Sequence, residues 1–286
     1  MKPILLCLLC LLRTVTCLAD DAASDLFARQ NLVAWCIVPF DANKRGPEER
    51  AAMLDRLGIK RLAYDWRAEH VPTFAAEIEA TKRHGIEFTA FWGAHEEAFK
   101  LFEKHGLKPQ IWVVLPKVDA ATQEERVKQA AEQILPIVRR AGNLGSALAI
   151  YNHGGWGGEP ANMVAVTKLL REKHDAAHVG IVYNLHHGHD HIHDFASVLA
   201  DMRPYLVCLN LNGMNDNAQP KILPVGSGQH DRQMIEVIKR SGYAGPIGIL
   251  CHRADMDAEV ALQQNLNGLK KLLREIGDEA ALKTYP

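Results

Sequence analysis

The sequence has little net charge, and this limits the partners that we expect for it. Its 33 basic and 34 acidic residues give a formal net charge of −1 over 286 residues. Proteins that bind nucleic acids or anionic membrane surfaces usually concentrate basic residues. We therefore expect no nucleic-acid partner.

Cysteines are few beyond the N-terminal segment, and they lack the paired spacing of a disulfide-rich domain. Only Cys36, Cys208 and Cys251 follow the first 17 residues. An odd number of cysteines, each inside a short apolar run, does not indicate a disulfide framework. We expect three buried thiols.

The sequence also lacks an apolar run long enough to cross a membrane. The run at residues 4–12 has roughly half the length that a spanning helix needs. Lys2 precedes it, and a small-residue stretch ending at Ala19 follows it. This order is typical of a secretory signal peptide, so we expect residues 1–19 to be removed and the protein to be secreted or periplasmic, without a membrane span. An apolar N-terminal helix and a lipid anchor at Cys17 are the alternatives.

Short apolar runs alternate with amphipathic stretches along the rest of the chain. Apolar residues recur at helical spacing over residues 47–57, 122–141, 163–170 and 260–273, which predicts helices. Several glycines are expected to end helices just before a strand, namely Gly58, Gly85, Gly106, Gly142 and Gly242. The predicted strands are residues 32–38, 61–64, 87–91, 110–115, 147–151, 180–183, 206–209 and 247–250.

This alternation predicts a single (β/α)8 TIM barrel over residues 28–280. The strands are apolar on both faces, as in a parallel sheet ringed by helices. The alternative is an open doubly wound sheet, which normally carries a glycine-rich phosphate loop after its first strand. Here the first strand ends in Val38, Pro39 and Phe40, which favours the barrel.

Polar and aromatic residues gather where the predicted strands end. In a TIM barrel these carboxyl ends form one rim, where the active site lies. Amides, imidazoles and aromatic rings suit a small carbohydrate, because its hydroxyl groups need hydrogen bonds and its C–H faces stack on rings. A phosphate would require more basic residues and a glycine nest. The predicted substrate-binding residues are Tyr64, Trp92, Tyr151, Asn152, Trp156, Tyr183, Asn184, His186, Asn210, Asn212 and His252. Trp156 belongs to the glycine-rich turn at residues 154–158, which is either a plain loop or a cover for the sugar ring.

Four segments resemble the xylose-isomerase-like TIM-barrel superfamily, which includes sugar isomerases, epimerases, keto-sugar lyases and apurinic endonucleases. They are YNHGG (151–155), YNLHHGH (183–189), LNLNGM (209–214) and VGSGQHDRQMIEVIKRSGYAGPI (225–247). The likeness extends over roughly residues 31–273. It implies the barrel fold and the chemistry of sugar isomerases and epimerases.

The resemblance also implies a divalent-metal site, but this sequence departs from the family at every ligand position. Most members hold the metal with a Glu, an Asp, a His and a Glu after strands five to eight. The corresponding positions are Tyr151, Asn184, Asn210 and a stretch near His252 without a carboxylate. Because Mg²⁺ and Mn²⁺ prefer charged oxygen ligands, we expect that site to be absent or weakened. A divalent metal such as Zn²⁺ on His153, His187 and His252 is the alternative.

Imidazoles can also transfer protons without a metal. By resemblance, His153 and His187 match the family's histidines after strands five and six, and we predict that both are catalytic. Asp65, Glu159 and Asp231 are the nearby carboxylates that would serve as a base instead. Two functions stay open. The first is an exported sugar or keto-sugar isomerase, epimerase or lyase that transfers a proton next to a carbonyl, and the second is a non-catalytic carbohydrate-binding or interaction protein.

Overall fold

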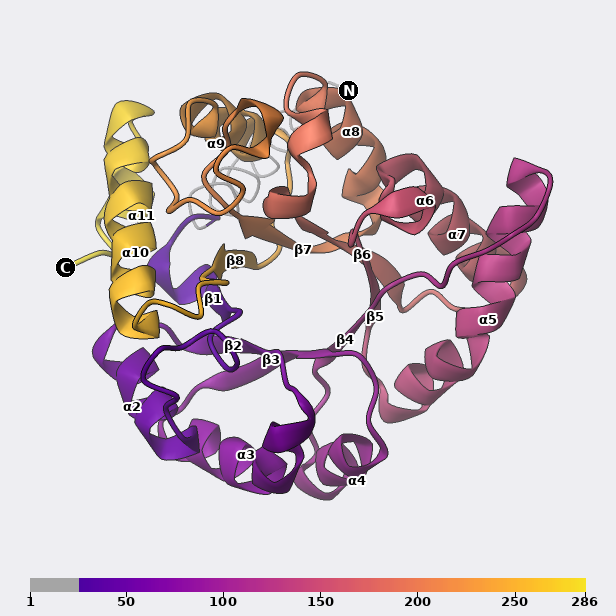
Figure 1. Ribbon diagram of the computed structural model, residues 1–286, viewed down its shortest axis with the longest axis horizontal. Helices are drawn as coiled ribbons and strands as arrows, with labels where there is room; N and C mark the ends of the chain where they lie inside the picture. The colour runs from indigo at the N-terminus through magenta and orange to yellow at the C-terminus, as the bar shows by residue number, and fades with distance from the viewer. Residues whose placement is uncertain (1–25) are drawn as a thin grey trace, which may run out of the picture.

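Eight parallel strands close into a barrel in the computed structural model, which describes residues 26–286. In chain order they are β1 (Leu32–Trp35), β2 (Arg61–Tyr64), β3 (Glu87–Trp92), β4 (Gln110–Val113), β5 (Leu148–Tyr151), β6 (Val179–Asn184), β7 (Leu206–Leu211) and β8 (Ile247–Leu250). The ring closes where β1 pairs with β8 in parallel. Figure 1 shows the strands at the centre and the helices around them. The predicted barrel is confirmed, whereas the predicted signal peptide lies outside the described residues.

The helices alternate with the strands as the apolar spacing predicted. They are α2 (Pro47–Arg56), α3 (Phe74–Arg83), α4 (Glu96–His105), α5 (Gln123–Leu144), α6 (Gly155–Gly158), α7 (Pro160–Lys173), α8 (Phe195–Met202), α9 (Asp231–Arg240), α10 (Ala258–Glu275) and α11 (Glu279–Leu282). Short 3₁₀ helices lie in the connections: η1 (Arg29–Asn31), η2 (Ala68–Thr73), η3 (Leu185–His187), η4 (His189–His191), η5 (Arg203–Tyr205) and η6 (Asp216–Ala218). No helix within residues 26–286 is long and apolar enough to cross a membrane.

Local sequence signals explain where α5 begins and ends. Thr122 and Glu125 form a capping box at its first turn, with the Glu125 backbone N–H 3.2 Å from the Thr122 hydroxyl. The helix ends at Gly145, whose φ of 75° is left-handed. The prediction that Gly142 closes this helix was wrong. Gly142 lies inside α5, where a Cβ atom would come within 2.9 Å of the His178 ring, so this glycine leaves room for that ring beside the helix.

Two apolar layers hold the barrel together. Helices pack on the outside of the sheet through a large cluster that includes Phe27, Leu62 and Phe91. A smaller cluster fills the barrel interior, and all eight strands contribute to it. The three cysteines of the described chain are buried and free, as predicted.

Large aromatic rings fill the barrel interior because small residues stand opposite them. Trp35 and Trp112 pack edge to face with ring centroids 4.8 Å apart. Alanines on β2, β3 and β5 leave room for these indoles. The indoles close the barrel below its mouth, so the open space lies at the carboxyl ends of the strands.

Candidate active site

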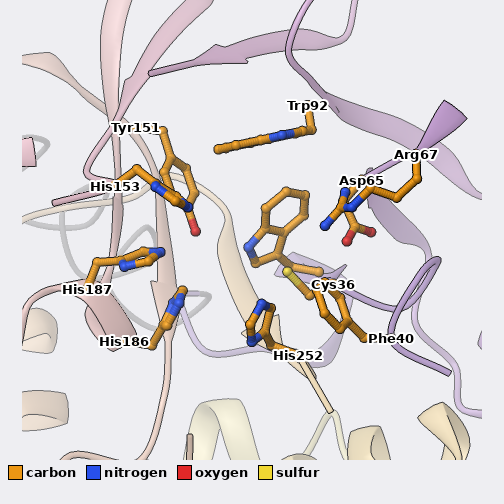
Figure 2. A pocket seen from close by; sticks show the side chains of 11 residues that line it. Cys36, Phe40, Asp65, Arg67, Trp92, Tyr151, His153, His186, His187 and His252 are labelled. Carbon is orange, nitrogen blue, oxygen red and sulfur yellow. The ribbon is translucent and has the colours of Figure 1, made fainter. Parts of the chain in front are cut away.

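A cavity of about 170 Å³ lies at the carboxyl ends of the strands, on the rim where the sequence predicted the site. This volume is well below the roughly 300–1,000 Å³ of pockets for drug-sized ligands, so it suits a ligand the size of a single sugar. Figure 2 shows the lining side chains. They are Trp35, Cys36, Phe40, Asp65, Arg67, Trp92, Tyr151, His153, His186, His187 and His252.

Four histidines form a continuous row along one side of the cavity. His153 follows β5, and its ring centroid lies 4.6 Å from that of His187 in η3. The rings of His187 and His186 are 3.6 Å apart, and the ring of His252, beyond β8, lies 5.4 Å from His186. The barrel therefore brings both predicted catalytic histidines together at the ends of the neighbouring strands β5 and β6.

Burial keeps three of these imidazoles neutral near pH 7. It lowers the pKa of His187 to about 3, and the neighbouring His153 adds to this effect. The pKa of His186 is lowered by burial and then by His187, and that of His252 by burial and then by Arg67. A neutral imidazole is a proton acceptor. His187 can therefore accept a proton from a ligand in the cavity.

Asp65 lies across the cavity from the row of histidines (Figure 2). It is 2% exposed. One carboxylate oxygen accepts a long hydrogen bond of 3.4 Å from the Val38 backbone N–H, and the other has no partner among residues 26–286. Burial raises the pKa of Asp65 to about 7, against the lowering effect of Arg67. A carboxyl group with a pKa near neutral can hold or release a proton at physiological pH, as general acid–base catalysis requires.

Four lining residues were missed by the sequence prediction: Trp35, Cys36, Phe40 and Arg67. The predicted first strand, residues 32–38, ran past its true end at Trp35, so Cys36 was placed inside the strand and not on the rim. Cys36 has a left-handed φ of 58° and His252 one of 35°, and the His252 backbone N–H donates to the Cys36 carbonyl at 3.3 Å. The sharp turns that end β1 and β8 therefore lie side by side at the cavity.

Asn152 and Asn184 support the histidines and do not line the cavity. The Asn152 amide group accepts from the Asn184 backbone N–H at 2.7 Å and donates to the Asn184 carbonyl at 3.0 Å. The Asn184 side chain donates to the Tyr151 hydroxyl and accepts from the His186 backbone N–H at 3.2 Å. Both asparagines, predicted to bind substrate, thus fix the ends of β5 and β6 and the start of η3.

Two predicted tyrosines face the helices and not the cavity. Tyr64 is buried beside Phe88 and Phe91, with the Phe88 ring 5.5 Å away. Tyr183 stacks on Phe195 at 6.3 Å. Successive side chains of a strand point to opposite faces, which places both hydroxyls outside the barrel.

Trp156 and Glu159 lie beside the cavity without lining it. The Trp156 indole N–H donates to the Gln123 side chain at 2.9 Å, and Trp156 packs against the outer core. The turn that contains it forms the short helix α6. Glu159 is exposed and lies 3.1 Å from His191. The structure therefore does not bring Glu159 together with His153 and His187.

The remaining predicted residues, on β7 and in the segment that follows it, contact other parts of the fold and do not line the cavity. Asn210 is fully buried, and a Cβ atom on Gly248 would lie 1.7 Å from its side-chain oxygen. The Asn212 side chain donates to the Lys221 carbonyl at 2.9 Å and accepts from the Leu223 backbone N–H at 3.3 Å. Asp231 accepts from three backbone N–H groups, the shortest at 2.6 Å from Met214. These contacts hold the loop between β7 and α9.

The residues at the family's metal positions do not fit a divalent cation. Tyr151 and Asn184 bond to each other, and Asn210 is packed against Gly248. The histidine alternative is not assembled either, because His252 adjoins His186 and not the pair of His153 and His187. Within residues 26–286, no group of three or more His, Cys, Asp or Glu side chains is arranged to hold a metal ion.

Comparison with known proteins shows which solved structures have a similar fold. No protein-family model and no curated protein matches the chain. Among solved structures, the chain is similar to the apo form of 3-keto-D-glucoside 4-epimerase YcjR from E. coli, with a TM-score of 0.62 and 16% identity over 86% of this chain and 99% of that chain. A xylose isomerase domain protein from Planctomyces limnophilus has a TM-score of 0.59 and 12% identity, over 88% of this chain and 99% of that chain. The IolI protein with a bound zinc atom has a TM-score of 0.63 and 13% identity, over 85% of this chain and 98% of that chain. The chain therefore has the TIM-barrel fold of these structures, which confirms the fold that the resemblance of its motifs implied.

Proposed function

We propose that this protein is an exported enzyme that isomerises, epimerises or cleaves by elimination a sugar or keto-sugar, through proton transfer next to a carbonyl. One observation carries the proposal. A carboxyl group with a pKa of about 7 at Asp65 and the neutral imidazole of His187 line one cavity from opposite sides (Figure 2). Proton removal and proton return at a sugar carbon need two such groups within reach of one ligand.

The reaction follows from the protonation states. The His187 imidazole takes the proton from the carbon next to the carbonyl, and the C–H electron pair moves into the new carbon–carbon double bond. The carbonyl oxygen takes the proton of Asp65, which gives an enediol. For the isomer, the His187 imidazolium gives its proton to the adjacent carbon, and the other enediol hydroxyl group gives its proton to Asp65. For the epimer, Asp65 first takes back the hydroxyl proton and then delivers it to the opposite face of the same carbon, and His187 passes its proton to solvent. No oxidant or reductant is needed, because atoms and electrons balance within the substrate.

The lining of the cavity supports a sugar ligand. Trp92 and Phe40 offer aromatic faces on which C–H groups can stack. The Tyr151 hydroxyl and the row of imidazoles offer hydrogen-bond partners for hydroxyl groups. A keto-sugar is also the substrate named for YcjR, one of the similar structures.

Export is part of the proposal and rests on residues 1–19 alone. The charged start, the apolar run at residues 4–12 and the small residues before Asp20 form the pattern of a secretory signal. N-terminal sequencing of the exported protein tests it, and the expected first residue is Asp20.

One observation favours a second function, a non-catalytic carbohydrate-binding protein derived from the same barrel. All four of the family's metal positions have lost the expected ligand, and two of them, Tyr151 and Asn184, bond to each other. A barrel that had lost its reaction would keep the aromatic lining and the polar rim for binding. Such a protein would bind sugars without exchanging their hydrogens.

Exchange of substrate hydrogen with solvent separates these two functions. The protein is incubated in D₂O with aldoses, ketoses and 3-keto-glycosides, and ¹H NMR follows loss of the signal at the carbon next to the carbonyl. The enzyme predicts exchange of one hydrogen in at least one compound, above the rate without protein. A compound that binds in saturation-transfer NMR without exchange contradicts the enzyme and supports the binding protein.

A further inference from the structure

We propose that the substrate of this site is a sugar acid, and that Arg67 binds its carboxylate. This inference rests on the proposed function, because it names the substrate class of the same cavity. Two observations support it: Arg67 lines the cavity, and positive charge exceeds negative charge around the cavity.

Arg67 follows β2 by three residues and lines the cavity next to Asp65 (Figure 2). Its guanidinium lies over the Phe40 ring, 5.5 Å from the ring centroid. This stacking is a cation–π contact that fixes the plane of the guanidinium. The guanidinium therefore has a defined orientation at the cavity.

Among the described residues, Arg67 uses one of its side-chain donors, so most of its hydrogen-bonding capacity is free. A guanidinium has five N–H donors. Nη1 donates to the Trp66 carbonyl at 2.7 Å, and within residues 26–286 no carboxylate forms an ion pair with Arg67. A planar guanidinium with free donors is the protein group that best matches the two oxygens of a carboxylate.

The charges around the cavity favour an anion. Within the part of the chain that the structure describes, Asp65 is the one carboxylate that lines the cavity, and burial raises its pKa to about 7. Lys221 follows β7, where its backbone carbonyl accepts from Asn212 at 2.9 Å, and its positive charge lowers the pKa of both His186 and His187. A surplus of positive charge near a cavity raises the local concentration of anionic ligands.

A carboxylate fits this cavity better than a phosphate does. The loop that carries Arg67 begins with Asp65 and Trp66 and contains no glycine nest of backbone N–H groups. The volume of about 170 Å³ also leaves little space for a phosphate beside a sugar ring. The cavity thus matches a monosaccharide whose carboxylate lies at Arg67 and whose carbonyl group lies between His187 and Asp65.

Binding of matched ligand pairs tests the inference. The pairs are D-glucuronate with D-glucose, D-galacturonate with D-galactose, and D-glucose 6-phosphate as the phosphate arm, measured by calorimetry with wild type, Arg67→Ala and Arg67→Lys. We expect at least one acid to bind roughly tenfold or more tightly than its neutral partner, the ratio that one charge-assisted hydrogen bond typically gives. Arg67→Ala should remove that ratio, and Arg67→Lys should keep only part of it. The control Arg253→Ala, whose guanidinium pairs with Asp255 at 3.3 Å outside the lining, should keep the ratio.

The same samples in D₂O separate this inference from the proposed function. Exchange of a sugar acid that is lost in Arg67→Ala supports both. If acids and neutral sugars bind equally and the neutral sugar exchanges hydrogen, the sugar-acid inference is overturned and the proposed enzyme function stands. If an acid binds through Arg67 but no hydrogen exchanges, the proposed enzyme function is overturned and the carboxylate site at Arg67 stands. Preferential binding of the phosphate arm, or no binding of any ligand, overturns the carboxylate assignment.

Discussion

The imidazole rings of His153 and His187 lie with their centroids 4.6 Å apart, although one residue follows β5 and the other lies beyond β6. Tyr151 pairs with Val182 across these strands, so β6 extends further toward the rim before its histidines begin. Asn152 and Asn184 fix the two strand ends to each other. The histidine pair is thus held by the backbone of the barrel, and it faces Asp65 on the far side of the cavity (Figure 2).

The first prediction concerns the pH dependence of the reaction. We expect kcat/KM to fall about tenfold per pH unit above about pH 7, because Asp65 must keep its proton to act as the acid. His187 has a pKa of about 3 and stays neutral over this range. A profile of kcat/KM between about pH 5 and pH 9 measures this fall. In Asp65→Asn the fall above about pH 7 should disappear, and kcat/KM should be roughly 10²–10⁴-fold lower than in wild type. A wild-type profile that stays flat to about pH 9 would contradict the role of Asp65.

The second prediction concerns metal removal. The residues at the family's metal positions include no carboxylate, and Tyr151 and Asn184 among them bond to each other. Neutral groups hold a hard divalent cation poorly. Exchange activity should therefore be unchanged after dialysis against EDTA. Activity measured before and after dialysis, with Mn²⁺ or Zn²⁺ added back, gives the answer. Loss of activity that either ion restores would show that a metal takes part.

The third prediction is a gain of stability in Asp65→Asn. Burial raises the folded-state pKa of Asp65 from 3.8 to about 7. Between these values the folded protein holds a proton that the unfolded chain has released, so stability falls as pH rises from about 4 to about 7. Above about pH 7 the loss amounts to about 4 kcal/mol at most.

Denaturant titrations of wild type and Asp65→Asn test this at two pH values. At about pH 8 the variant, which carries no buried charge, should be the more stable protein. At about pH 4 the two proteins should unfold at similar denaturant concentrations. A variant that is less stable than wild type at about pH 8 would show that the Asp65 carboxylate stabilises the fold.

The fourth prediction concerns the close approach of Asn210 to β8. A Cβ atom on Gly248 would lie 1.7 Å from the Asn210 side-chain oxygen. Gly248→Ala should displace Asn210 and lower the free energy of unfolding by about 1–3 kcal/mol. Gly46→Ala is the matched control, because its Cβ atom would meet nothing closer than 3.8 Å, and its effect should stay within about 0.5 kcal/mol. Equal stabilities of the two variants would mean that Asn210 moves aside freely.

The strands and their order could be predicted from the sequence because apolar runs and helix-ending glycines recur regularly. Helix ends were less certain. Gly142 and Gly145 are both candidates to end α5. The structure shows that the helix ends at Gly145 and that Gly142 packs against the His178 ring. Local sequence does not contain that contact.

The direction of each side chain at the rim could not be predicted in the same way. Tyr151-Asn152 and Tyr183-Asn184 look like two copies of one motif. Yet Tyr151 lines the cavity while Tyr183 stacks on Phe195 outside the barrel. The stagger between neighbouring strands of a closed barrel shifts the register, and a shift of one residue moves a side chain to the other face. The histidines were predictable because they follow the strands. Beyond a strand end, the alternation of side chains between the two faces of the sheet no longer determines where a side chain points.

Deuterium incorporation by His187→Ala tests the central claim most directly. Wild type and the control His174→Ala, which changes an exposed histidine beyond α7, are incubated in D₂O with the same sugar as the variant. Deuterium should appear next to the carbonyl with wild type and with the control, and not with His187→Ala. Incorporation by His187→Ala at the wild-type rate would contradict the account, because another group would then be moving the proton.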